Sequence, residues 1–142
     1  MRKPRKSKST TVVIGSSRLG ASIASMSSMD GIYTTIIDKD PSSFKKLDSG
    51  YSGLFITGDA EETETLRKAH IEDAKECIIA TGDDDTNVFL ACLVTGLYKV
   101  PYVIVRLRDE RKAALLNDPR IKVISTAMLS LQSYKSIRAL EE

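Results

Sequence analysis

The chain has 142 residues, of which 42% are hydrophobic and 28% charged, and its formal net charge is +2. These values are typical of one globular domain that is large enough to bury a core. No apolar run approaches the roughly 20 residues that span a bilayer, and no signal-peptide stretch opens the chain, so we expect a cytoplasmic protein. One histidine and two cysteines exclude a structural zinc site, and we expect Cys77 and Cys92 to be reduced thiols in the core.

Residues 1–9 are predicted to form a flexible basic tail. Its cations are Arg2, Lys3, Arg5, Lys6 and Lys8. Such a cluster suits either contact with nucleic acid or an anionic membrane face, or a solvated arm. No aromatic side chains are interleaved with these charges, so we favour the solvated arm and expect no nucleic-acid partner.

The stretch from Val12 to Ala21, VVIGSSRLGA, is typical of the first strand, phosphate loop and first helix of a nucleotide-binding βαβ unit. Gly15 permits a tight turn, Gly20 lets the helix lie close to the sheet, and the first N–H groups of the helix attract a phosphate. Ser17 departs from the G-x-G-x-x-G pattern, because it places a side chain where the middle glycine lets a pyrophosphate approach.

Apolar strand patterns and amphipathic helix patterns alternate along the chain, which indicates an α/β fold. The predicted strands are Thr10–Ile14, Ile32–Ile37, Ser52–Thr57, Cys77–Ala80, Pro101–Val105 and Ile121–Ile124. The predicted helices are Arg18–Met29, Pro41–Asp48, Glu61–His70, Val88 to about Tyr98, Asp109–Asn117 and Thr126 to about Leu140. We expect Leu19, Ile23 and Met26 to face the sheet from the first helix. The apolar positions of the fourth helix cover more than one stripe and should bury that helix against the sheet; they are Val88, Phe89, Leu90, Leu93, Val94 and Leu97.

Right-handed crossovers between these strands predict a Rossmann-like, doubly wound parallel sheet of six strands in the order 3-2-1-4-5-6, with helices on both faces. Residues 10–125 would form this nucleotide-binding domain. Residues 126–142 would form a C-terminal helix, whose leucines pack either on the domain itself or on a neighbouring subunit.

Ligands of such sheets bind beyond the carboxyl ends of the strands, between the first and fourth. Asp38 ends the second strand, where a carboxylate accepts hydrogen bonds from ribose hydroxyls; the alternative is a residue that closes a turn. Asp59 and Ala60 follow the third strand and suit the adenine side, and Thr81-Gly82 follows the fourth and suits the ribose or phosphate, although both also read as plain turns. Asp83–Asp85 suits an N-terminal helix cap, where negative charge is stabilising.

These motifs, in this order and spacing, resemble the TrkA-N family, also called the RCK N-terminal family. The resemblance rests on IGSSRLG at 14–20, IDKD at 37–40, GDA at 58–60, ATGDDDTN at 80–87 and VRLRD at 105–109. Members of this family are cytosolic regulatory domains or subunits of potassium transporters and channels. They bind NAD(H), ADP or ATP and assemble as dimers and as rings, often of eight, beneath the membrane pore.

The resemblance implies a regulatory homo-oligomer on the inner face of the membrane, whose partner is a membrane-embedded potassium transporter subunit. It places Asp38 on the ribose, Arg18 on a phosphate and Arg106 in the pocket. The full set of candidate nucleotide-binding residues is Gly15, Ser16, Ser17, Arg18, Leu19, Gly20, Asp38, Lys39, Asp59, Ala60, Thr81, Gly82 and Arg106. Some members hold a divalent ion with an acid after the sixth strand; Ser125, Thr126 and Ala127 stand there, so we expect no metal.

Alternatives remain open. An NAD-dependent oxidoreductase is disfavoured because the chain has no Tyr-x-x-x-Lys pair and His70 is poorly placed, so we expect no enzyme. The third hypothesis is a module that keeps the fold but binds no nucleotide, because the Ser17 side chain stands where a pyrophosphate would approach. Among nucleotides, Asp38 disfavours NADP, whose 2′-phosphate it would repel. The motif suggests NAD, whereas Ser17 slightly favours ATP or ADP.

Overall fold

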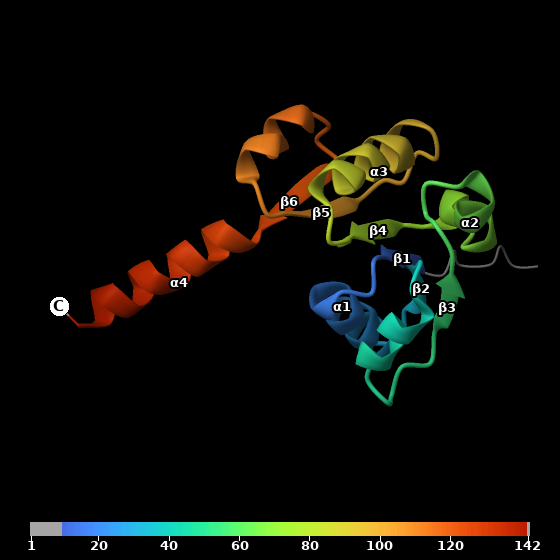
Figure 1. The fold of residues 1–142 in the computed structure, drawn as a ribbon, viewed down its shortest axis with the longest axis horizontal. Coiled ribbons are helices and arrows are strands. Elements are labelled where there is room, and N and C mark those ends of the chain that lie inside the picture. The colour runs from blue at the N-terminus through green and yellow to red at the C-terminus, as the bar shows by residue number, and fades with distance from the viewer. Residues whose placement is uncertain (1–9, 142) are drawn as a thin grey trace, which may run out of the picture.

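A computed structural model describes residues 10–141 and shows a six-stranded parallel sheet with helices on both faces (Figure 1). The strands are β1 (Thr10–Ile14), β2 (Tyr33–Asp38), β3 (Leu54–Thr57), β4 (Glu76–Ile79), β5 (Val103–Leu107) and β6 (Ile121–Ser125). Their order is β3-β2-β1-β4-β5-β6, which confirms the predicted fold. The basic tail at residues 1–9 lies outside the described residues.

Four α-helices and three 3-10 helices connect the strands. The α-helices are α1 (Arg18–Met29), α2 (Thr63–Lys68), α3 (Asp84–Gly96) and α4 (Thr126–Leu140). The 3-10 helices are η1 (Pro41–Lys46), η2 (Ile71–Asp73) and η3 (Glu110–Leu115). Helix α1 and η1 pack on one face over β1 and β2, whereas α3 and η3 pack on the other, over β4 and β5.

Two helical predictions were wrong in type, since residues 41–48 and 109–117 form short 3-10 turns. In η1 the hydroxyl of Ser43 donates to the carbonyl of Asp40, a local bond that competes with a regular α-helix. In the second segment, Pro119 disfavours helical backbone at Asp118, so a helix cannot continue through this stretch, and η3 ends before it, at Leu115. The strand predictions were right in place and shifted by up to two residues at their ends.

The helices meet the sheet through narrower faces than predicted. Met26 is 59% exposed, Phe89 51% and Leu97 64%, and Cys92 is also exposed, so these four expectations were wrong. Helix α1 instead approaches the sheet through small residues, namely Gly20, Ala21, Ala24, Ser25 and Ser28. Such residues bring the helix backbone close to the strands. Leu19 and Ile23 pack against the core beside them, as predicted, whereas Met26 and Met29 are exposed.

Helix α4 leaves the sheet at the end of β6 and projects away from the domain (Figure 1). Among the other elements it makes its main contact with β6. Its large apolar side chains are exposed, namely Met128, Leu129, Leu131, Tyr134, Ile137 and Leu140. In this structure α4 therefore does not cover the sheet of its own chain.

The fully buried side chain of Asn87, in α3, ties the ends of β4 and β5 together. Its Oδ1 accepts from the backbone N–H of Thr81 at 3.2 Å and from the Thr81 hydroxyl, and its Nδ2 donates to the carbonyl of Arg106 at 2.9 Å. Asp83 caps α3 as predicted, accepting from the N–H of Thr86 at 2.8 Å. Asp84, by contrast, accepts from the backbone N–H groups of Arg108 and Asp109 and thereby holds the turn after β5.

We expect Gly20→Ala to destabilise the domain by about 3 kcal/mol, because a Cβ at this position would lie 1.9 Å from the backbone oxygen of Gly15. Gly96→Ala is the matched control: it lies in α3 with open space around the new methyl group, and we expect no loss of stability. Urea unfolding followed by circular dichroism measures both. Equal midpoints for the two variants would contradict the close packing of α1.

We expect Asn87→Ala to lower the free energy of unfolding by about 3 kcal/mol, because it leaves buried groups of Thr81 and Arg106 without partners. Asn87→Asp keeps the acceptor for Thr81 but places a buried carboxylate against the carbonyl of Arg106, so it should also be less stable than wild type at neutral pH. The exposed Asn117→Ala serves as the control. The midpoints of thermal unfolding rank the three variants by stability. An Asn87→Ala midpoint at the wild-type value would exclude a structural role for the Asn87 side chain.

Candidate functional site

A cavity of about 420 Å³ opens at the carboxyl ends of β1, β2, β3 and β4, the place where the strand order reverses. Predicted residues that line it are Gly15, Ser16, Ser17, Asp38, Lys39, Asp59, Ala60, Thr81 and Gly82. Further lining residues include Asp40, Ser43, Lys46, Gly58 and Asp83. The structure thus brings together side chains from four strand ends that are far apart in the sequence.

The turn between β1 and α1 requires both outer glycines. Gly15 has a φ of +100°, and a Cβ there would lie 2.7 Å from the backbone of Ala80 and Thr81. Gly20 lies directly beneath the carbonyl of Gly15. Ser17 has φ −75° and ψ 177°, an extended conformation that any residue adopts, so the backbone does not require glycine at the middle position.

The Ser17 hydroxyl is engaged within the loop. It donates to the carbonyl of Ala80 at 2.7 Å and accepts from the backbone N–H of Gly20 at 3.2 Å, which makes it the N-cap of α1. Because its only proton is donated to the carbonyl of Ala80, this hydroxyl cannot at the same time donate to a phosphate. It also occupies one of the N–H groups with which a helix start binds anions.

Asp38 holds the loops on either side of it. Its Oδ2 accepts from the backbone N–H of Ser16 at 2.7 Å, and its Oδ1 accepts from the N–H of Asp40 at 2.8 Å. A carboxylate has about four lone-pair positions, so acceptor capacity remains for ribose hydroxyls after these two bonds. The two interpretations of Asp38, a ribose-binding residue and a residue that closes a turn, are therefore compatible.

Four predicted residues lie outside the lining of this cavity. Arg18 is exposed at the first position of α1, Leu19 packs on the core beneath that helix, and Gly20 contacts Gly15. Arg106 donates through its guanidinium to the carbonyls of Ala80 at 3.2 Å and Thr81 at 2.6 Å. Arg106 thus bonds to the backbone that follows β4. Contact of these four residues with a nucleotide remains a prediction.

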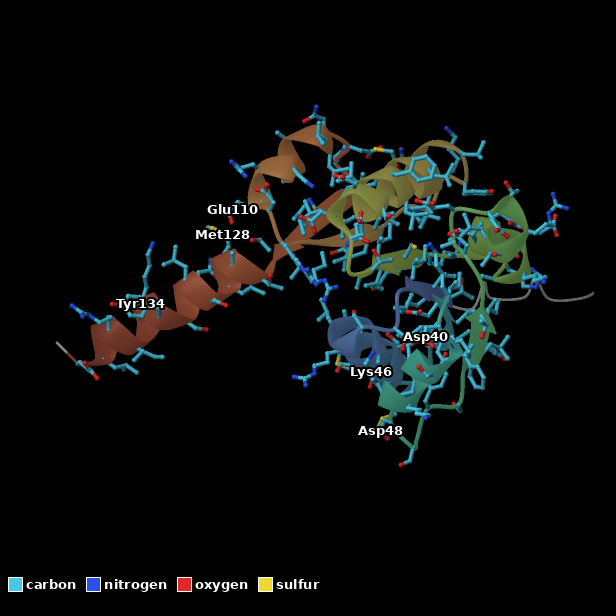
Figure 2. All side chains as sticks on the ribbon, viewed as in Figure 1. Asp40, Lys46, Asp48, Glu110, Met128 and Tyr134 are labelled. Carbon is cyan, nitrogen blue, oxygen red and sulfur yellow. The ribbon has the colours of Figure 1, made fainter. Side chains whose placement is uncertain are left out.

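Two lining residues that the sequence did not single out, Ser43 and Lys46, come from η1. The Ser16 hydroxyl donates to the carbonyl of Ser43 at 3.0 Å, and the Lys46 ammonium donates to the carbonyl of Ser16 at 3.0 Å. Figure 2 shows Lys46 on the 3-10 turn that packs beside α1. The Asp40-Pro41 pair marks the start of this helix in the sequence, but no sequence signal places Lys46 beside the phosphate loop.

The charges around the cavity are mixed, with carboxylates in excess. Asp38, Asp40, Asp59 and Asp83 line it, against Lys39 and Lys46. Lys39 pairs with Asp59 at 3.5 Å. The pKa of the Asp40 carboxyl is lowered first by the hydroxyl and N–H of Ser42, which donate to it, and further by the positive charges of Lys46 and Lys45.

Away from the cavity, His70, Glu72 and Asp73 bring potential metal-ligand atoms within 4.8 Å of one another. All three are exposed and lie at the amino ends of the strands, beside the start of β1. In residues 10–141, no helix has the length and apolarity that a membrane crossing needs.

Comparison with known proteins identifies relatives of this fold and sequence. The Trk system potassium uptake protein TrkA of Streptomyces coelicolor is 30% identical over 115 residues, which are 81% of this chain and 52% of that protein. The chain thus spans about half the length of the curated relatives it matches.

Among solved structures, GsuK bound to ADP superposes with a TM-score of 0.78 at 23% identity, over 97% of this chain and 36% of that one. The GsuK channel bound to NAD gives 0.77 at 23% identity, over 96% and 24%. At this identity the likeness shows a shared fold. The model of the TrkA-N domain family matches residues 11–127, and the chain belongs to that family.

Proposed function

We propose that this chain is a cytosolic, nucleotide-sensing regulatory subunit of a potassium uptake transporter, and that it catalyses no reaction. NAD(H) or ADP/ATP would bind in the cavity at the carboxyl edge of the sheet. The observation that carries the proposal is the convergence of the glycine turn and Asp38 on a cavity at the point where the strand order reverses. Membership of the TrkA-N family and the names of the relatives support the transport role.

In this proposal the adenosine lies over the ends of β2 and β3. The ribose hydroxyls donate to Asp38, the adenine lies beside Asp59 and Ala60, and the phosphates lie on the turn from Gly15 to Gly20, with Lys39, Thr81 and Gly82 at the rim. Arg18 and Arg106 reach the ligand only after their side chains turn from their present positions. No metal takes part.

The partner is a membrane-embedded potassium transporter subunit, and the chain acts on it as a homo-oligomer, a dimer or a ring of eight, beneath the membrane. A ligand regulates such an assembly only if it binds two arrangements of the assembly with different affinity. The exposed apolar side chains of α4 are the surface that we assign to contact with a second copy.

Titration calorimetry with ADP, ATP, NAD, NADH and NADP tests the binding site. We expect micromolar binding of at least one of the first four and a loss of about 10- to 100-fold in Asp38→Ala, because hydrogen bonds to a charged acceptor are lost. NADP should bind more weakly than NAD, because Asp38 repels its 2′-phosphate.

Two controls accompany this titration. Asp38→Asn keeps an acceptor for Ser16 or Asp40 and should retain the fold, and Asp73→Ala removes an exposed carboxylate at the opposite end of the strands. If none of the five nucleotides binds to the wild-type protein, the sensing role is wrong and the chain is an assembly module.

Light scattering after size-exclusion chromatography tests the oligomer. We expect at least a dimer for the wild-type chain, and a monomer for the double variant Leu131→Glu, Ile137→Glu, because charges on α4 oppose apolar contact. Lys135→Glu changes charge on the same helix without removing apolar surface and serves as the control. A wild-type monomer with and without nucleotide would contradict the regulatory assembly.

A further inference from the structure

We propose that Lys46 binds the terminal phosphate of an adenine nucleotide, and that it makes this cavity select nucleotides with a terminal phosphate over dinucleotides. The inference rests on the proposed function, because it concerns the same cavity. It assigns a specificity-determining role to a residue that lies in η1, outside the glycine motif.

The position of Lys46 is set by two hydrogen bonds between η1 and Ser16 of the turn after β1. The ammonium donates one hydrogen bond to the carbonyl of Ser16, one residue before the N-cap of α1. A second bond, from the Ser16 hydroxyl to the carbonyl of Ser43, fixes η1 against the same residue. An ammonium has three N–H groups, so two of them remain for a ligand on the phosphate loop.

The charge balance of the cavity makes Lys46 the available cation. In residues 10–141, Lys39 is paired with Asp59, whereas no carboxylate forms an ion pair with Lys46. Arg18, the cation expected from the motif, is exposed and lies outside the lining. An anionic ligand that enters among four lining carboxylates therefore meets its unpaired positive charge at Lys46.

The same geometry distinguishes two kinds of phosphate. In a dinucleotide both phosphates are bridged and each carries a single negative charge, whereas a terminal phosphate carries about −1.5 to −2 at neutral pH. Ser17 already occupies the N–H of Gly20 and places a side chain at the middle position of the turn, which weakens the part of the loop that binds a bridging pyrophosphate. Lys46 therefore stabilises a terminal phosphate more than a bridging phosphate, because Coulomb attraction scales with the charge of the phosphate.

Titration calorimetry of ADP and NAD against wild type, Lys46→Met, Lys46→Arg and Lys45→Met tests this inference. We expect Lys46→Met to weaken ADP binding about tenfold and NAD binding by less than about threefold, since charge-assisted bonds to the terminal phosphate are lost. Lys46→Arg keeps the charge and should retain the preference for ADP. Lys45→Met is the matched control, because Lys45 is the exposed neighbour of Lys46 and does not line this cavity.

The ratio of the two affinities separates recognition from loop damage, since loss of the bond to Ser16 alone would weaken ADP and NAD alike. An equal change for both nucleotides, no change for either, or an equal effect of Lys45→Met would overturn the role of Lys46 while leaving nucleotide binding intact. Failure of the wild-type protein to bind either nucleotide would overturn the proposed function, and this inference with it.

Discussion

The close contact between the start of α1 and the end of β1 is the constraint on which the rest of the site depends. Gly20 lies so near the carbonyl of Gly15 that no side chain fits between them, and Gly15 itself lies against the backbone of Ala80 and Thr81, just after β4. This contact brings the N-terminus of α1 to the switch point of the sheet, which is where its N–H groups can meet an anion. The middle position differs, because Ser17 fits the backbone and caps the helix. The backbone therefore requires the two outer glycines, whereas at the middle position it accepts a serine, whose hydroxyl caps α1 and bonds to Ala80.

Asp38 extends this constraint to the second loop. Its carboxylate joins the N–H of Ser16, in the phosphate turn, to the N–H of Asp40, which begins η1. Ser16 then joins η1 again through its hydroxyl and its carbonyl. The cavity wall is thus a closed set of short polar contacts, in which the groups that would bind a ribose also position the groups that would bind a phosphate. A polar network of this kind is rigid only while every member has its partner.

The architecture could be predicted from the sequence because β1 and β4 contain continuous apolar runs and each of the first four strands leads into small or acidic residues. The strand order and most of the cavity lining followed from that pattern. Lys46 could not be predicted, because its role depends on a 3-10 turn that packs beside α1, and no local motif specifies that packing. Met26 was wrongly placed because small residues form the face of α1 that lies closest to the sheet. Phe89 and Leu97 were wrongly placed because the apolar positions of α3 cover more than one face, and only the face that carries Leu90 and Val94 is buried. Asn87 lies within a recognised motif, yet its bonds to Thr81 and Arg106 require the fold.

A continuous set of bonds connects the cavity with α4, although they lie at different parts of the sheet (Figures 1 and 2). Thr81 lines the cavity, and the Asn87 side chain bonds both Thr81 and the carbonyl of Arg106 in β5. Arg106 in turn pairs with Ile124 of β6, and Ser125 of the same strand caps α4. These links are strand pairing, a buried amide and a helix cap. Such a path carries regulation only if the loop after β4 has two arrangements that a nucleotide binds unequally, since a ligand with equal affinity for both shifts neither.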